Sequence, residues 1–341
     1  ESLLISGHGY SGDVDVTTLA SKFNLSGGQI RDAIFTASNI TMAKKPGESE
    51  LSMSDLCLGC KAQSNKKLTT MAKKIEPHYI WDDIILPTDV KEQLKEISGH
   101  IEHKQTVYYE WGFERKLSLG KGLNVFFSGP SGTGKTMAAE IIAGEVGLDL
   151  YKIDLSSVVS KYIGETEKNL NRIFKEAETS NAILFFDEAD ALFGKRSEVR
   201  DSHDRYANIE TNYLLQKMEE HEGIVILASN LKKNIDEAFL RRLNFNIVFP
   251  FPDEKIREKI WRSIFPDRTP IADDIDFSFL ANFKITGGNI KNIALSAAFL
   301  AASDSRIITM EHIIRAVKRE FQKMGKLCTP SEFGQYHELV K

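Results

Sequence analysis

Five short, mainly apolar runs alternate along the chain with segments in which apolar residues recur every three or four positions; the second run also contains Asp149 and Lys152. The runs lie near residues 123–128, 148–153, 182–187, 223–229 and 245–250. Short, nearly continuous apolar runs are typical of strands covered on both faces in a parallel sheet, and the intervening spacing is typical of amphipathic helices. The alternation therefore predicts an α/β fold in which a parallel sheet forms the middle of a three-layer αβα sandwich.

A glycine-rich segment follows the first of these runs directly. Residues 129–136 read Gly-Pro-Ser-Gly-Thr-Gly-Lys-Thr, which satisfies the phosphate-binding pattern G-x-x-x-x-G-K-[ST]. The glycines let successive backbone N–H groups turn toward one phosphate at the N-terminus of the next helix, and Lys135 adds a positive charge. The Thr136 hydroxyl is the expected Mg²⁺ ligand. A chance glycine turn is the alternative, but the strand before it and the helical pattern after it favour a nucleoside triphosphate bound by Gly129, Pro130, Ser131, Gly132, Thr133, Gly134, Lys135, Thr136 and Met137.

Paired carboxylates follow the third apolar run, which leads into Asp187-Glu188-Ala189-Asp190. The carboxyl ends of parallel strands are where open α/β sheets carry their active sites. Asp187 is placed to hold Mg²⁺ through water, and Glu188 to orient and partly deprotonate the attacking water. An acidic helix cap after a buried strand would account for Asp187 alone. Together with the phosphate-binding segment, the pair predicts hydrolysis of the bound nucleotide.

The fourth run ends at Ser229-Asn230, and Arg241-Arg242 follow. This order of phosphate loop, Asp-Glu pair, strand-end asparagine and arginine resembles the AAA+ ATPases, and within them the AAA family proper, over about residues 80–325. The resemblance implies ATP and Mg²⁺ as cofactors, Asn230 as the sensor of the γ-phosphate, and Arg241 as a finger offered to a neighbour's nucleotide. It thereby implies a homo-oligomeric ring, a hexamer. Asn244 stands where the family often has a second arginine, so Arg242 is the candidate replacement.

The same resemblance assigns further nucleotide contacts. Trp81–Leu86, which includes Ile84 and Ile85, is similar to the segment that holds the adenine. Gly288, in Thr286-Gly287-Gly288-Asn289-Ile290, resembles the start of the helix with which a C-terminal helical lid closes on the base and ribose.

Lys161, Tyr162 and Ile163 resemble the first pore loop of substrate-threading members, with Tyr162 gripping a protein substrate. A packed core position is the alternative for Tyr162. The charged segment 194–204 is expected to form a loop, either on the same face or simply solvated. Residues 160–219 are also similar to bacterial AAA ATPases that accompany contractile injection systems.

The start of the chain resembles a later part of it. Asp15–Ala20 followed by Ser26–Arg31 matches Asp276–Ala281 followed by Thr286–Lys291, with a one-residue difference in length. The second copy belongs to the predicted lid, so the first resembles the lid of a preceding AAA-type domain; chance similarity is the alternative. We predict a small helical module with a helical connector (51–75) in residues 1–76, a nucleotide-binding domain in 77–251 and a C-terminal helical lid in 252–341.

The composition of the chain bears on which partners and which location the sequence predicts. A net charge of −4 and a pI near 6.1 provide no basic surface for nucleic acid. No apolar stretch approaches the ~20 residues of a membrane span, and no signal peptide is visible, so a cytoplasmic location is predicted. Cys57 and Cys60 have zinc-like spacing without a second pair, which favours reduced thiols. The chain begins with Glu1 and is expected to be part of a longer polypeptide.

The predicted function is Mg²⁺-dependent ATP hydrolysis by a ring that remodels, unfolds or disassembles proteins or protein complexes. One alternative is an assembly factor in which ATP acts as a binding switch without threading. The other is a nucleic-acid remodeller, against which the missing basic surface counts.

Overall fold

The computed structural model describes residues 9–23, 25–44, 50–64, 72–116, 120–158, 164–178, 182–191, 202–230, 237–304, 306–326 and 330–340. Contacts between residues divide the chain into two compact units, which are described separately. The first unit comprises residues 1–78, 95–127 and 139–247, and the second comprises residues 79–94, 128–138 and 248–341. The three domains expected from the sequence stay a prediction.

A six-stranded sheet forms the centre of the first unit, in the strand order β3-β5-β6-β7-β4-β8. The neighbours β5, β6 and β7 run parallel, with Leu150 opposite Ile183 and Ile183 opposite Ile224. The side chains of β6 and β7 are almost wholly buried, as continuous Val, Ile, Leu and Phe runs require, whereas β5 has Lys152 half-buried and Asp154 exposed. The prediction of a largely parallel sheet is therefore confirmed. The strands are β3 (Lys73–Ile75), β4 (Leu123–Ser128), β5 (Asp149–Asp154), β6 (Ala182–Asp187), β7 (Ile224–Ser229) and β8 (Phe245–Val248).

The edge strand β3 corrects the sequence analysis, which placed residues 51–75 in a helical connector. A helix does occupy Met53–Ser64, but Lys73–Ile75 pairs antiparallel with β5, with Lys74 opposite Tyr151. Lys-Lys-Ile has neither the apolar content nor the alternation of a typical strand. Its conformation is set by the unpaired edge of β5, which lies far away in the sequence.

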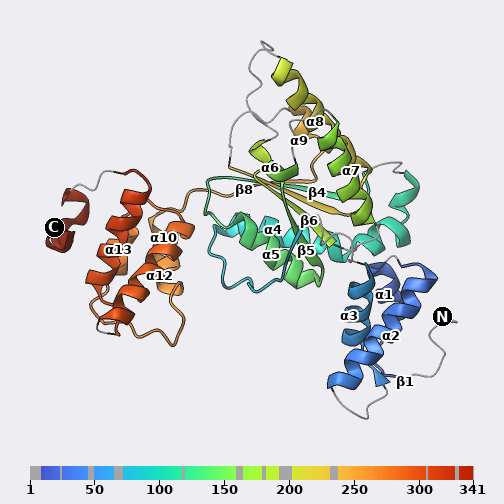
Figure 1. Ribbon diagram of the computed structural model, residues 1–341, viewed down its shortest axis with the longest axis horizontal. Helices are drawn as coiled ribbons and strands as arrows, with labels where there is room; N and C mark the ends of the chain where they lie inside the picture. The colour runs from blue at the N-terminus through green and yellow to red at the C-terminus, as the bar shows by residue number, and fades with distance from the viewer. Residues whose placement is uncertain are drawn as a thin grey trace. The chain divides into compact units, whose positions relative to one another are not determined.

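Helices cover both faces of this sheet. Figure 1 shows α7 (Glu165–Glu178) and α8 (Ser202–Glu220) on one side and α4 (Thr88–Glu102) and α5 (Lys135–Val146) on the other. Because side chains alternate along a strand, Leu184 and Phe186 of β6 join one apolar cluster with α7 and α8, whereas Ile183 and Phe185 are buried on the opposite face. The shorter elements of this unit are η2 (Thr106–Glu110), η3 (Phe113–Lys116), α6 (Leu155–Val158), η4 (Ala189–Ala191) and α9 (Glu237–Leu240).

The N-terminal module, defined as residues 9–64, is a small helical part of the first unit. Two short parallel strands bring Tyr10 opposite Leu51. The core between its helices contains Ala37, Leu51 and Leu56. Its elements are β1 (Gly9–Tyr10), α1 (Val16–Lys22), α2 (Gly27–Lys44), β2 (Glu50–Leu51) and α3 (Met53–Ser64).

The helices of the second unit pack around their own apolar core, which includes Trp261, Phe283 and Phe321. The Asp253 side chain caps the first of them by accepting a hydrogen bond from the Ile256 N–H at 2.8 Å. We call the part from residue 252 onward the C-terminal lid. Its helices are α10 (Glu254–Ser263), α11 (Phe277–Ala281), α12 (Gly287–Ser303), α13 (Met310–Lys323) and η5 (Pro330–Val340). None of the helices in the described ranges is long and apolar enough to span a membrane.

Candidate functional site

The predicted phosphate loop connects the end of β4 to the start of α5, where Lys135 is the first helical residue. Three of its glycines have positive φ angles: 144° at Gly129, 76° at Gly132 and 103° at Gly134. A Cβ atom on Gly129 would also lie 2.1 Å from the carbonyl oxygen of Phe249. The loop therefore requires glycine for both its backbone conformation and its packing.

Lys135 is buried by the loop that precedes it, with 7% of its surface exposed. Its Nζ donates hydrogen bonds to the carbonyl oxygens of Gly129 at 2.7 Å and Pro130 at 3.0 Å. The Thr133 hydroxyl donates to the same Pro130 oxygen at 2.8 Å. The ammonium group is thus held against the loop backbone, where a phosphate bound by the loop would be a stronger, anionic acceptor.

Two predicted nucleotide contacts from other parts of the chain meet this loop within the second unit. The Gly288 N–H, in the first turn of α12, donates to the Gly132 oxygen at 2.9 Å. A Cβ atom on Gly288 would lie only 3.0 Å from the Gly132 Cα. Ile84 is buried, and its Cδ1 is 3.5 Å from the position a Cβ on Gly134 would occupy. The structure thus brings the loop, Ile84 and Gly288 together. Of the other predicted nucleotide contacts, Ser131 is exposed, and the half-buried ones are Pro130, Ile85, Thr136 and Met137.

The paired carboxylates lie in the first unit at the carboxyl end of β6. Asp187 is its last residue and forms an ion pair with Lys152 of β5, with 2.6 Å between Nζ and Oδ2. The other carboxylate oxygen of Asp187 accepts a hydrogen bond from the Glu188 N–H at 3.0 Å. Glu188 is exposed and has a φ of 54°, a conformation that costs free energy in any residue with a Cβ. The backbone therefore presents the Glu188 carboxylate to solvent.

A hydrogen bond joins the ends of β6 and β7. The Asp190 carboxylate accepts it from the backbone N–H of Asn230 at 3.2 Å, which fixes the residue predicted as the γ-phosphate sensor relative to the Asp-Glu pair. Neither Asp190 nor Lys152 has a role predicted from the sequence. Asp190 was visible in the acidic run after β6, but the approach of Lys152 depends on the pairing of β5 with β6.

The two candidate fingers, Arg241 and Arg242, directly follow α9, and both side chains are exposed. Arg242 forms an ion pair with Glu219 of its own chain, with 2.7 Å between Nε and Oε1. Asn244 pairs with Asn124 of β4: its side-chain oxygen accepts from the Asn124 N–H at 2.7 Å, and its own N–H donates to the Asn124 oxygen at 2.8 Å. An asparagine at this position thus contributes to the pairing of β8 with β4.

Some predicted features lie outside the described residues, including the pore-loop candidates Lys161, Tyr162 and Ile163. Residues 194–201 of the predicted charged loop also lie outside the described residues. The prediction of a loop was wrong for residues 202–204, which form the start of α8. Cys57 and Cys60 lie half-buried within α3. Burial, together with the neighbouring Cys57, raises the pKa of the Cys60 thiol to about 11, which disfavours the thiolate that a metal would need. No group of three metal-ligating side chains occurs in the described ranges.

Comparison with known proteins identifies the nucleotide-binding region. Residues 125–252 match the model of the ATPase family associated with various cellular activities (AAA). The chain is 31% identical to a proteasome-activating nucleotidase of Methanopyrus kandleri over 78% of its own length and 61% of that protein. It is 30% identical to an ATP-dependent zinc metalloprotease FtsH of Caldicellulosiruptor bescii, over 80% of its own length and 45% of that protein. With cell division protein C of Sulfolobus acidocaldarius it shares 30% identity over 82% of its own length and 70% of that protein.

The chain thus spans about half to two thirds of the length of these relatives. The matched region begins in β4 and ends just after β8, so it includes the phosphate loop, the Asp-Glu pair, Asn230 and both arginines. ATP and Mg²⁺ are the cofactors of this family, in agreement with the oxygen ligands and the lysine found here. The narrower similarity to ATPases of contractile injection systems stays a prediction. On its sequence, its sheet and these relatives, the chain belongs to the AAA family of ATPases.

Proposed function

We propose that this chain binds and hydrolyses ATP with Mg²⁺ as a subunit of a homo-oligomeric ring, and that the ring remodels, unfolds or disassembles proteins. The observation that supports this best is the convergence of the glycine loop, the buried Lys135, Ile84 and Gly288. Protein substrates are supported by the relatives, one of which is a proteasome-activating nucleotidase and another an ATP-dependent metalloprotease.

In this proposal the loop glycines and Lys135 bind the phosphates, and the Thr136 hydroxyl and, through water, Asp187 hold Mg²⁺. Glu188 orients the attacking water and accepts its proton. The exposed carboxylate of Glu188 and its costly backbone conformation support a catalytic role, because such conformations are concentrated at functional sites. Asn230 contacts the γ-phosphate, and Asp190 keeps it in position through the hydrogen bond to its backbone.

Arg241 is proposed to stabilise the transition state at the nucleotide of a neighbouring subunit, which is why a ring is part of the proposal. Arg242 is the weaker candidate, since its guanidinium already pairs with Glu219. Gripping of the protein substrate is proposed for Tyr162, with Lys161 and Ile163 beside it.

The experiment that tests this proposal separates nucleotide binding from hydrolysis. Lys135→Ala should abolish binding of a fluorescent ATP analogue, whereas Glu188→Gln should bind it normally and turn over ATP about 10³-fold more slowly. Lys217→Met is the matched control, because Lys217 pairs with Glu220 on the surface of α8 and should affect neither quantity. Equal loss of binding in the Lys135 and Glu188 variants would contradict the assigned roles.

The ring is tested by mixing subunits. If Arg241 acts on a neighbour, wild-type chains mixed with Arg241→Ala chains should lose ATPase activity more steeply than dilution alone predicts. The total chain concentration has to be varied, since assembly follows mass action. Activity that falls in proportion to the wild-type fraction at every concentration would argue against a finger acting between subunits.

A further inference from the structure

The N-terminal module has the same order of elements as residues 271–323 of the C-terminal lid, the part between α10 and η5. In both, a short extended segment is followed by two helices, a second extended segment and a third helix. In the module the two extended segments pair in parallel, with Tyr10 opposite Leu51. In the lid the corresponding bridge is also parallel and joins Ile271 to Ile308.

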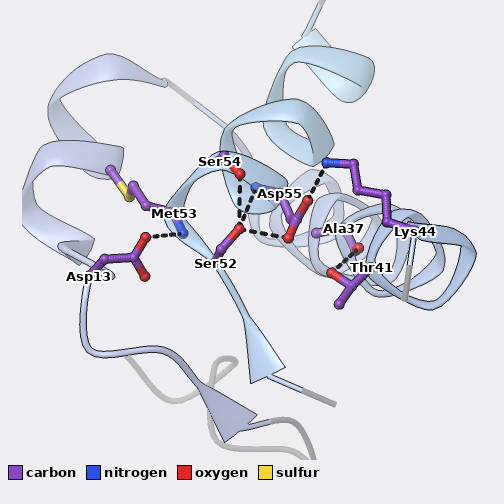
Figure 2. A network of polar contacts seen from close by, with 8 residues as sticks. All are labelled: Asp13, Ala37, Thr41, Lys44, Ser52, Met53, Ser54 and Asp55. Atoms are coloured by element: carbon purple, nitrogen blue, oxygen red, sulfur yellow. Dashed lines mark hydrogen bonds and ion pairs between the residues drawn. The ribbon is translucent and has the colours of Figure 1, made fainter. Parts of the chain in front are cut away.

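The two copies use the same side chain to fix the start of their third helix. Asp13 accepts a hydrogen bond from the backbone N–H of Met53 at 3.2 Å, as Figure 2 shows. Asp274 accepts one from the backbone N–H of Met310 at 3.4 Å. In each copy an aspartate just after the first extended segment therefore binds the first residue of the third helix, α3 in the module and α13 in the lid.

The start of the second helix is capped in the same way in both copies. In the module, the Ser26 N–H and hydroxyl donate to the Gln29 side-chain oxygen at 2.9 and 3.0 Å. In the lid, the Thr286 N–H and hydroxyl donate to the Asn289 side-chain oxygen at 3.2 and 2.8 Å. Two glycines follow the capping residue each time, so the backbone entering α2 repeats the backbone entering α12.

The second helix of each copy is buried at the same position. Ala37 of α2 and Ala297 of α12 are fully buried at equivalent positions after the paired glycines. The closeness of the third helix differs: a Cβ on Gly59 of α3 would be 2.2 Å from the Ala33 oxygen, whereas Ala316 stands at the same distance from the start of α13. Such agreement in extended segments, helix caps and aspartate contacts argues against chance similarity.

The two copies differ in the contacts that the second of the paired glycines makes. In the C-terminal lid the second glycine, Gly288, donates its N–H to Gly132 of the phosphate loop and leaves no room for a side chain. Gly28 is its counterpart, and no atom of the described residues lies within 4 Å of a Cβ placed on it. Its φ is not in the positive range. Glycine destabilises a helix relative to alanine, and none of the described contacts of the module requires it at this position.

We propose that the N-terminal module is the lid of a second α/β nucleotide-binding body, and that Gly28 is where the phosphate loop of that body approaches. In the C-terminal copy the body precedes its lid in the chain, so the second body belongs N-terminal to residue 9 in the same polypeptide. Its ligand is a nucleoside triphosphate, an assignment that rests on the function proposed above for the site at Gly132 and Gly288. The polypeptide then contains two nucleotide sites.

The test counts bound ATPγS by equilibrium dialysis, in the 341-residue chain and in the full polypeptide that the gene encodes. We expect one nucleotide per 341-residue chain and two per full polypeptide. Lys135→Ala should remove one from each. A full polypeptide that binds a single nucleotide, whether because the preceding segment has no phosphate loop or because no such segment is encoded, would overturn the proposal. Failure of Lys135→Ala to remove a nucleotide would instead contradict the site at Lys135.

Gly28→Val tests the contact itself. In the full polypeptide carrying Lys135→Ala it should weaken the remaining ATPγS site about tenfold or more, because a side chain would keep the phosphate loop away. Gly12→Val is the matched control, because Gly12 is also a module glycine with open space around it. In the 341-residue chain Gly28→Val should change neither the melting temperature nor nucleotide affinity. Weaker nucleotide binding there would mean that the module covers the site of another copy, and would overturn the proposal.

Discussion

The strands β4, β6 and β7 carry very different residues at their two ends. At the carboxyl ends are Asp187, Glu188 and Asn230, whose side chains are half-buried or exposed. At the amino ends the chain is packed tightly around His221, which is 5% exposed. A Cβ on Gly122 would lie 2.0 Å from the His221 oxygen, and a Cβ on Gly223 would lie 2.3 Å from its Nε2.

This difference separates two uses of the same sheet. Polar side chains at the carboxyl ends lie where a ligand and water can reach them, so changing them should alter chemistry more than stability. Residues at the amino ends hold neighbouring strands together, and Leu123 donates its N–H to the Gly223 oxygen there at 2.9 Å. Changing those residues should alter stability more than chemistry. Both ends of the strands require glycine, but for different reasons. At the amino end a side chain on Gly122 would have no room, and at the carboxyl end Gly129 has a φ of 144°.

The largest effect is expected at the carboxyl end from Glu188→Gly. Turnover should fall about 10³-fold, because the base that activates water is lost. The free energy of unfolding should rise by about 1 kcal/mol, because glycine adopts the φ of 54° without strain. ATPase assays and urea unfolding measure the two quantities. Glu188→Ala is the control and should lose turnover without gaining stability; a stability loss in the glycine variant would contradict this view of the carboxyl end.

The opposite result is expected at the amino end from Gly122→Ala. The added Cβ would meet a backbone oxygen at 2.0 Å, so the free energy of unfolding should fall by about 3 kcal/mol or more. Turnover per folded molecule should be unchanged. Gly99→Ala provides the control, because Gly99 lies within α4 with no described atom within 4 Å of its Cβ position, and it should gain about 0.5–1 kcal/mol. A Gly122→Ala protein that is fully stable but inactive would contradict the expectation that residues at the amino ends affect stability more than chemistry.

His221 should make the stability of the amino end depend on pH. Burial, and then the charge of Lys104, lowers the pKa of this histidine to about 4, while its usual value is near 6.5. Between these values the unfolded chain binds a proton that the folded chain does not, so stability should fall as pH decreases from about 6.5 to about 4. The loss should be on the order of 2–3 kcal/mol. His221→Gln removes the titrating group, and urea unfolding across this range should show a flatter profile; an equal slope in both proteins would refute the assignment.

The smallest effect is expected from Lys152→Met at the carboxyl end. Lys152 pairs with Asp187 and would compete with Mg²⁺ for this carboxylate, so its removal should let Mg²⁺ bind more easily. The Mg²⁺ concentration for half-maximal ATPase activity should fall about two- to fivefold, which matches the modest free energy of partly exposed ion pairs. Lys152→Arg keeps the charge and should behave like the wild type. A higher Mg²⁺ requirement in Lys152→Met would show that the lysine supports the metal site.

Local signals in the sequence were sufficient for much of this fold. The apolar runs at β4 and β6 were predicted with the observed bounds, because such buried parallel strands are continuous and end at polar residues. β5 and β7 were predicted to within one residue. β8 was predicted to end two residues later than it does. The glycine loop was recognisable because each of its residue types serves a backbone or charge requirement within one short segment.

Other features depended on residues far apart in the chain. β3 is a strand because the edge of β5 was open to it, although Lys-Lys-Ile alone predicts no strand. The pairing of Lys152 with Asp187 follows from the register of two strands, and Asn244 joins β8 to β4 through Asn124. Such partners cannot be identified from spacing, because the chain between them has no fixed length.

The sequence by itself determined that this protein is an AAA ATPase with a phosphate loop, an Asp-Glu pair and a helical lid, because each of these features depends on residues that are close together in the sequence. Only the tertiary structure decided which groups contact one another: Gly288 donates to Gly132, Asp190 accepts from the Asn230 backbone, and Asp13 and Asp274 accept matching hydrogen bonds from Met53 and Met310. The physical reason is that backbone requirements are local, whereas close packing and hydrogen-bond partners are fixed only when distant segments meet.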